Sequence, residues 1–104
     1  MAFERACATS EVPKDEALGV IVGDLEVAIA RDGEEIFAIR NECSHAAVAL
    51  SEGDVDDCTI ECWMHGSRFD LRTGKPTGPP ATEPVPIFPV QIDGDDVLID
   101  LGDN

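Results

Sequence analysis

Four side chains that can bind metal lie in two short boxes near the middle of the sequence. The first box reads Cys43-Ser44-His45 and the second reads Cys62-Trp63-Met64-His65. Sixteen residues separate the boxes, and each box pairs one thiol with one imidazole. The chain has no other histidine. The spacing therefore indicates one metal centre built from two loops.

Thiolate and imidazole ligands suit two kinds of centre. Two cysteines and two histidines satisfy tetrahedral zinc, although a single residue between Cys43 and His45 is a tight spacing for a zinc box. The same ligands suit a cluster of two irons and two sulfides, with the thiolates on one iron and the imidazoles on the other. Such a cluster carries less negative charge than one held by four thiolates. Its potential is therefore higher, at about −150 to +300 mV against about −400 mV.

Short runs of apolar residues surround the boxes, and no long helical period occurs. The expected strands are residues 18–22, 25–30, 36–40, 87–92 and 97–101. Gly23-Asp24, Asp32-Gly33 and residues 93–96 separate neighbouring runs and are typical of hairpin turns. The pattern predicts an all-β fold, an antiparallel sandwich or barrel with a small loop-rich subdomain.

That subdomain is predicted at about residues 41–86. The segment carries both histidines and three of the four cysteines. Its run Pro76-Thr77-Gly78-Pro79-Pro80 cannot form a central strand. A length of 104 residues fits one domain, residues 1–104. Function is expected in the insert, because loops on a rigid scaffold usually carry it.

The charge balance excludes several partners. The chain has 22 acidic and 7 basic residues, a net charge of −15. This argues against nucleic acid and against anionic lipid surfaces. No apolar stretch approaches the length of a membrane span, and the first residues show no secretory signal. We therefore expect a cytoplasmic protein, in which cysteines serve as ligands or core residues.

The two boxes together resemble those of the Rieske 2Fe-2S proteins. The resemblance continues through residues 65–76, which read HGSRFDLRTGKP. Gly78-Pro79-Pro80 is similar to the loop that covers the cluster in that family. Pro84-Val85-Pro86 and the last hairpin match its closing strands. The chain length is close to that of free-standing Rieske ferredoxins, and the pattern is similar to actinobacterial ferredoxin subunits of non-haem iron oxygenases.

The resemblance implies one Rieske-type 2Fe-2S cluster per chain, bound by Cys43, His45, Cys62 and His65. It implies a one-electron carrier and not an enzyme. A flavin-dependent ferredoxin reductase would supply the electron and a non-haem iron oxygenase would accept it. The carrier is expected to be a monomer. Both histidines are used by the cluster, so a 2-His-1-carboxylate iron site is excluded.

The subclass also follows from the resemblance. Respiratory Rieske proteins carry a disulfide between the boxes at the positions of Val48 and Met64, and a tyrosine at that of Phe69. Neither feature is possible here, so a low-potential ferredoxin is expected. Ser67 stands where the respiratory type has a serine that donates to a cluster sulfide, and it should raise the potential. Trp63 departs from the proline that is usual after this cysteine.

Alternative interpretations stay open at this point. The same cluster could serve iron–sulfur assembly or redox sensing, and a structural zinc domain with two cysteines and two histidines is the competing class. Cys7 and Cys58 are expected to be small, buried apolar residues. Phe69 and Leu71 alternate with Arg68 and Asp70 and are expected in the core. Four apolar residues that interleave with the ligands are expected to shield the cluster. These are Val48, Leu50, Trp63 and Met64.

Overall fold

The fold is described from a computed structural model, which covers residues 3–42, 49–62, 67–77 and 83–101. This part of the chain contains ten strands and two 3-10 helices, and no α-helix. The elements are β1 (Phe3–Ala8), η1 (Thr9–Glu11), β2 (Ala17–Val22), β3 (Leu25–Asp32), β4 (Glu35–Arg40), η2 (Leu50–Glu52), β5 (Val55–Asp56), β6 (Thr59–Glu61), β7 (Arg68–Asp70), β8 (Ile87–Phe88), β9 (Val90–Asp93) and β10 (Asp96–Asp100). The predicted all-β class is confirmed. Within the same ranges no helix is long and apolar enough to cross a bilayer.

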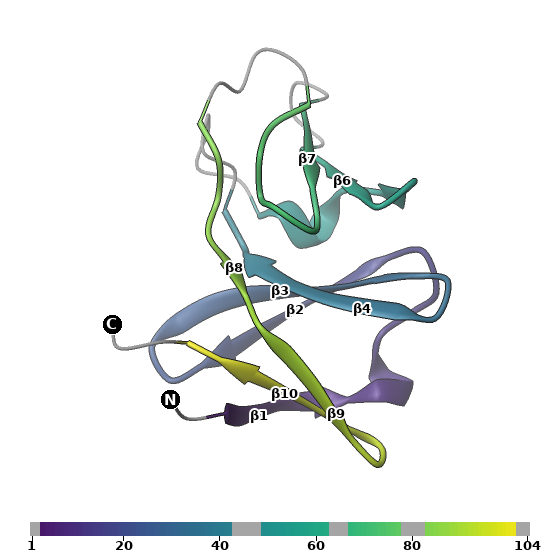
Figure 1. Ribbon diagram of the computed structural model, residues 1–104, viewed down its shortest axis with the longest axis vertical. Helices are drawn as coiled ribbons and strands as arrows, with labels where there is room; N and C mark the ends of the chain where they lie inside the picture. The colour runs from purple at the N-terminus through teal and green to yellow at the C-terminus, as the bar shows by residue number, and fades with distance from the viewer. Residues whose placement is uncertain (1–2, 43–48, 63–66, 78–82, 102–104) are drawn as a thin grey trace.

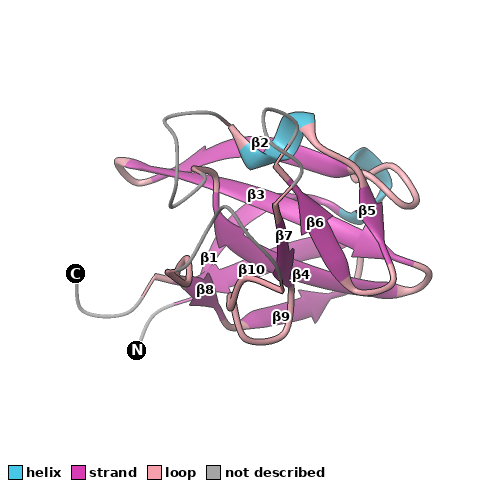
Figure 2. Ribbon diagram, turned by 90° about the horizontal axis from the view of Figure 1, so that it is seen from above, coloured by secondary structure: helices cyan, strands magenta, loops and turns pink. Residues whose placement is uncertain are grey.

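The strands form three antiparallel sheets stacked in layers (Figure 1). The middle layer has the order β2-β3-β4-β8, and the layer below it has the order β1-β10-β9. A small sheet β5-β6-β7 lies above the middle layer, as the view from above also shows (Figure 2). We call residues 49–62 and 67–77 the upper lobe, and residues 3–42 and 83–101 the lower lobe. The upper lobe contains most of the described part of the predicted insert.

Strand β3 is buried on both faces and joins the two lobes. Val27 and Ile29 pack into the core of the lower lobe, which also includes Val97 and Ile99. Ala28 and Ala30 point the other way, into a second core formed with the upper lobe. Strand residues alternate between faces, so large and small side chains are sorted to opposite sides. The small alanines leave room for the bulkier upper core.

The three tight hairpins each use a two-residue turn with glycine first. Gly23, Gly33 and Gly94 have φ of 62°, 63° and 63°, the left-handed values that glycine adopts without strain. A glycine at the first turn position is typical of type II′ turns, which suit the twist of a hairpin. The prediction of Gly23-Asp24 is confirmed. The second turn is Gly33-Glu34, one residue later than predicted, because Asp32 pairs with Glu35.

The single strand predicted at residues 87–92 is wrong. Ile87 and Phe88 pair with β4 in the middle sheet, whereas Val90 onward pairs with β10 in the lower sheet. Pro89 lies at the change of sheet and has no N–H to donate to either ladder. Its carbonyl still accepts a hydrogen bond from the Asp100 N–H, at 3.1 Å. The proline therefore marks where the chain crosses between layers.

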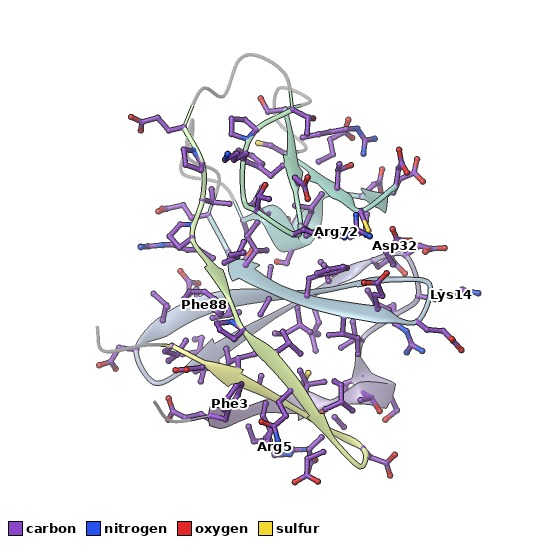
Figure 3. The ribbon with its side chains drawn as sticks, in the orientation of Figure 1. Phe3, Arg5, Lys14, Asp32, Arg72 and Phe88 are labelled. Atoms are coloured by element: carbon purple, nitrogen blue, oxygen red, sulfur yellow. The ribbon has the colours of Figure 1, made fainter. Side chains whose placement is uncertain are left out.

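The turn end of the β3–β4 hairpin contacts the upper lobe through two carboxylates. Asp32 accepts a hydrogen bond from the Cys58 backbone N–H at 2.6 Å. Glu35 forms an ion pair with Arg72, with 3.7 Å between Oε1 and Nη2. Figure 3 shows Asp32 and Arg72 at this junction. The ion pair is exposed and contributes little, whereas the bond to Asp32 fixes the turn between β5 and β6.

Two glycines are required because backbone carbonyls approach them closely. A Cβ on Gly53 would overlap the Glu61 carbonyl, although its φ of −91° suits any residue. A Cβ on Gly74 would overlap the Val85 carbonyl, and its φ is +79° as well. A Cβ on Gly94 would meet nothing within 4 Å. The three positions therefore separate steric overlap from backbone strain.

We predict that Gly53→Ala and Gly74→Ala lower the unfolding midpoint far more than Gly94→Ala. Gly94→Ala introduces only a left-handed alanine, at a cost of about 1 kcal/mol. Overpacking against a carbonyl should cost about 3 kcal/mol, and Gly74→Ala adds strain to it. In a domain of this size each kcal/mol lowers the midpoint by about 4–8 °C. Thermal unfolding followed by circular dichroism measures the differences, and equal midpoints for the three variants would contradict the packing described.

Candidate functional site

The structure describes one of the four predicted ligands, Cys62. Cys43, His45 and His65 lie outside the described residues, as do Val48, Trp63, Met64 and Gly78-Pro79-Pro80. Within the described ranges no three His, Cys, Asp or Glu side chains gather to hold a metal ion. The site is therefore built from what flanks each ligand segment.

The second box is closed by a backbone hydrogen bond. The Cys62 N–H donates to the Ser67 carbonyl at 2.6 Å, which continues the pairing of β6 with β7 beyond Glu61 and Arg68. Cys62 and Ser67 are both fully buried. The segment 63–66, which carries His65, thus leaves and re-enters the fold at two hydrogen-bonded neighbours. Buried anchors of this kind hold a ligand loop with little freedom.

The first box is closed by side-chain hydrogen bonds. Asn41 follows β4, and its Oδ1 accepts from the Ser51 backbone N–H at 2.7 Å. Its Nδ2 donates to Ser51 Oγ at 3.0 Å. The Asn41 N–H donates to the Glu26 carbonyl of β3, also at 3.0 Å. The nine residues between Asn41 and Ser51 include Cys43 and His45, so this amide fixes both ends of the first ligand segment.

Backbone hydrogen bonds fix the two ends of the proline-rich segment. The Thr77 N–H donates to the Arg68 carbonyl at 2.8 Å, before the segment begins. After it, the Arg40 N–H donates to the Pro86 carbonyl at 2.9 Å. Arg40 is the last residue of β4 and immediately precedes Asn41. Three segments that carry predicted ligands or covering residues therefore start and end at hydrogen-bonded residues. We call these residues the platform: Arg40, Asn41, Ser51, Cys62, Ser67, Arg68, Thr77 and Pro86.

The upper core supports this platform. Leu50, Ile60 and Phe69 are fully buried and pack in one cluster with Cys62. Phe69 and Leu71 are confirmed as core residues, with exposed fractions of 0% and 2%. Leu50 also belongs to this core, next to Ser51 in η2. Burial of a leucine or phenylalanine contributes about 1.5–3 kcal/mol each, which is enough to keep the loop ends in place.

The two remaining cysteines differ from Cys62. Cys7 is buried in the lower core, as predicted, and burial raises the pKa of its thiol. The prediction that Cys58 is buried is wrong: it is half-buried in the turn after β5, with φ of +57°. Burial and then the hydrogen bond with Asp32 raise the pKa of the Cys58 thiol. A raised pKa disfavours the thiolate form, which is the form that binds metal.

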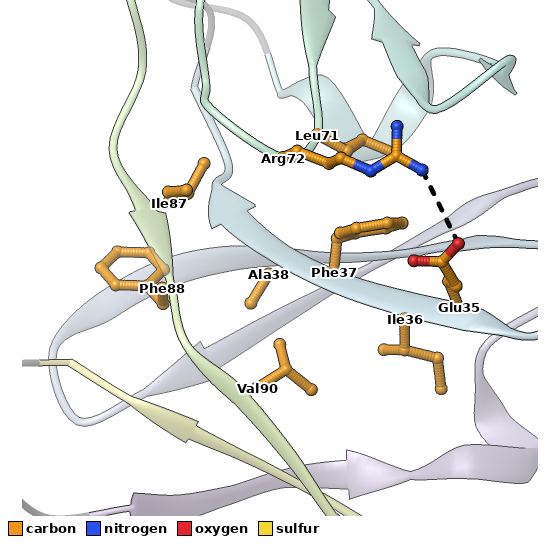
Figure 4. A pocket seen from close by; sticks show the side chains of 9 residues that line it. All are labelled: Glu35, Ile36, Phe37, Ala38, Leu71, Arg72, Ile87, Phe88 and Val90. Carbon is orange, nitrogen blue, oxygen red and sulfur yellow. Dashed lines mark ion pairs between the residues drawn. The ribbon is translucent and has the colours of Figure 1, made fainter.

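A groove of about 390 Å³ runs along the junction of the lobes (Figure 4). Phe37, Leu71, Ile87 and Phe88 line it, and its charged residues are Glu35 and Arg72. These two form the ion pair drawn in the figure. Apart from this ion pair, the lining residues that the structure describes include no acid, base or nucleophile.

Sequence reasoning missed Asn41, Ser51 and the bonds they form. Asparagine before a ligand box and serine after it are common in any polar loop, so neither residue carried a signal by type. The side-chain pairing depends on the position of η2 over the sheet, which only the packed upper core defines. The alternation of apolar and polar residues along the strands does not show how close residues 41 and 51 lie.

The chain matches known proteins along most of its length. The family model for the Rieske [2Fe-2S] domain matches residues 3–89. The chain is 43% identical over 102 residues to the biphenyl dioxygenase ferredoxin subunit of Pseudomonas sp. (strain KKS102), covering 97% of this chain and 94% of that protein. The match is long enough to include both boxes and all three sheets.

Solved structures agree with the sequence match. The ferredoxin of carbazole 1,9a-dioxygenase from Nocardioides aromaticivorans IC177 superposes with a TM-score of 0.89 at 35% identity, covering 95% of this chain and 97% of that one. A chain from the complex of reduced oxygenase and oxidized ferredoxin in carbazole 1,9a-dioxygenase superposes with a TM-score of 0.84 at 31% identity. That alignment covers 93% of this chain and 91% of the other. The fold described above is thus shared with free-standing ferredoxins.

We predict that Cys62→Ser removes most of the bound iron, whereas Cys58→Ser leaves it unchanged. A serine hydroxyl is not ionised at neutral pH and is a poor replacement for thiolate, while Cys58 is not among the predicted ligands. Iron and acid-labile sulfide are counted on purified protein, and circular dichroism checks that each variant is folded. Cys43→Ser should behave like Cys62→Ser. A Cys62→Ser variant with the parent's iron content would show that Cys62 does not hold the metal.

Proposed function

The chain belongs to the Rieske [2Fe-2S] domain family, and we propose that it carries single electrons to the oxygenase component of a dioxygenase that acts on aromatic compounds. Its cofactor is a Rieske-type 2Fe-2S cluster. When bound, the cluster accepts one electron and later donates it. The chain's own residues hold the cluster and keep it close to a surface where two partners dock in turn.

We propose Cys43, His45, Cys62 and His65 as the ligands, one thiolate and one imidazole from each box. The donor set fits the cofactor, because two thiolates and two imidazoles are the ligands of a Rieske cluster. The platform supports the same assignment: buried Cys62 leaves the fold beside Ser67, and Asn41 closes the other segment. Neutral imidazoles leave the cluster less negative than four thiolates would, so the electron is accepted at a higher potential.

The proposal that an oxygenase accepts the electron rests on the names of the relatives. Similar proteins are ferredoxin subunits of biphenyl dioxygenase and of 3-phenylpropionate/cinnamic acid dioxygenase. One structural neighbour comes from a complex of ferredoxin with an oxygenase. We propose a flavin-dependent ferredoxin reductase as the electron donor. The chain is then a carrier and not the catalyst, because its two histidines are taken by the cluster.

The charges of the described residues fit a transient partner with a basic surface. Four arginines each lie within 4 Å of a carboxylate that offsets their positive charge. They are Arg5 with Asp96, Arg40 with Glu42, Arg68 with Glu61, and Arg72 with Glu35. The excess of acidic residues therefore dominates the charge of the chain. A field of one sign speeds encounter without requiring tight binding. We also propose a cytoplasmic location, a reducing compartment that would keep thiols outside the boxes, such as Cys7 and Cys58, free.

The experiment that tests this function starts from the protein's spectra. The purified protein should be red-brown, contain two irons and two sulfides, and show a Rieske-type EPR signal only after reduction with dithionite. A flavoprotein reductase with NADH or NADPH should then reduce it, and an aromatic-ring dioxygenase should reoxidise it during product formation. A colourless protein that contains zinc, even when produced with ample iron, would replace electron transfer with a structural zinc domain.

We predict that Ser67→Ala lowers the reduction potential by roughly 40 mV, the one-electron equivalent of one hydrogen bond. The fully buried Ser67 borders the second box, where its hydroxyl would donate to the cluster and stabilise the more negative reduced state. Redox titration followed by EPR measures the potential. Ser10→Ala, at an exposed site in η1, is the control and should not shift it. An unchanged potential in Ser67→Ala would place the hydroxyl bond elsewhere.

A further inference from the structure

The two ligand boxes are closed by different kinds of hydrogen bond. The second box is closed between backbone groups of Cys62 and Ser67, so that bond uses neither side chain. The first box is closed by the side chain of Asn41, which holds both the backbone N–H and the hydroxyl of Ser51. The geometry of the first box therefore depends on the identity of one residue.

Asn41 supplies what the short helix η2 lacks. The N–H groups in the first turn of a helix have no partner within that helix. The Ser51 N–H is one of these, and Asn41 Oδ1 accepts its hydrogen bond from outside at 2.7 Å. The neighbouring Leu50 is fully buried in the upper core and prevents η2 from moving away. The amide thus joins the end of β4 to a helix whose position is already fixed.

Strand β2 leaves space for the contact between Asn41 and Ser51. Gly19 lies in β2, and a Cβ there would stand 2.9 Å from Ser51 Oγ and 3.0 Å from Asn41 Nδ2. Such distances are shorter than ordinary van der Waals contact, so any larger residue would push the pair apart. The backbone of Gly19 has no positive φ that would require glycine. The absence of a side chain at this position is explained by the close approach of Asn41 and Ser51.

We propose that Asn41 is a positioning residue for the first pair of cluster ligands, and that its clamp on Ser51, with Gly19 as the space beneath it, sets how long the cluster is retained. This inference rests on the proposed function, because it takes Cys43 and His45 as ligands. Asn41 itself binds no iron. It fixes the two ends of the nine-residue segment, so the thiolate and the imidazole stay together when one metal bond opens.

The test compares cluster lifetimes of the intact protein and its variants. Each is incubated with an excess of an iron chelator well below its unfolding temperature, and the decay of the visible absorbance is followed. In Asn41→Ala both bonds to Ser51 are lost, and cluster loss should be about tenfold faster. Ser51→Ala removes only the hydroxyl acceptor and should be about threefold faster. The double variant should be no faster than Asn41→Ala, because both act on one contact.

Two further variants separate positioning from general destabilisation. Asn41→Asp keeps the acceptor for the Ser51 N–H, and the Ser51 hydroxyl can donate to its second oxygen, so the lifetime should return close to the parent's. Gly19→Ala displaces the pair without altering either member and should shorten the lifetime. Glu11→Ala is the matched control: it removes a bond of 2.8 Å from the Ala8 N–H in the lower lobe and should leave the lifetime unchanged.

EPR of the reduced protein adds a second measurement, the width of the signal, which does not depend on overall stability. The signal of Asn41→Ala should be broader than the parent's, because a loosened segment allows several ligand arrangements. An unchanged lifetime and linewidth in Asn41→Ala, with a parent that holds two irons and two sulfides, would overturn the clamp alone. Equal acceleration in Asn41→Ala and Glu11→Ala would also overturn it. A parent without the cluster would overturn the ligand set, and the clamp's role with it.

Discussion

The structure depends on a single strand that is buried on both faces. β3 packs Val27 and Ile29 downward and Ala28 and Ala30 upward, so each lobe completes its core on the same strand. Because the upward residues are alanines, Leu50, Ile60 and Phe69 lie directly against the sheet. The upper lobe is too small to bury enough apolar surface alone. It completes its core against the middle sheet of the lower lobe. Any ligand loop held by the upper lobe is therefore held by the whole fold.

Rigid loop ends are the result of this arrangement. Hydrogen bonds at Cys62 and Ser67, at Asn41 and Ser51, and at Arg68 and Thr77 all lie where a core residue is adjacent. Ligand segments fixed at both ends would hold a bound cluster in one arrangement when its charge changes. The hydrogen bonds gather at the ends of the ligand segments. Gly53 and Gly74 have no side chain, so the carbonyls of Glu61 and Val85 can approach them closely.

The cysteines show how environment assigns function to identical side chains. Cys62 is buried beside a predicted ligand segment, Cys7 is buried in the lower core, and Cys58 lies half-exposed in a turn against Asp32. Burial raises the pKa of the Cys7 and Cys58 thiols, which disfavours the thiolate that would bind metal. A protein that must assemble a metal centre among four thiols benefits when the two outside the boxes do not compete for iron.

The sequence alone determined the all-β class, most of the strands, the hairpin turns and the two boxes with their chemistry. These are properties of neighbours along the chain: alternation has a period of two, turns need glycine, and ligands have characteristic spacings. Only the tertiary structure decided that residues 87–92 divide between two sheets, that Cys58 is half-exposed, and that Asn41 meets Ser51 above Gly19. Each of these depends on the distance between segments remote in sequence, and that distance is set by the packing of the upper core on β3, which no local pattern encodes.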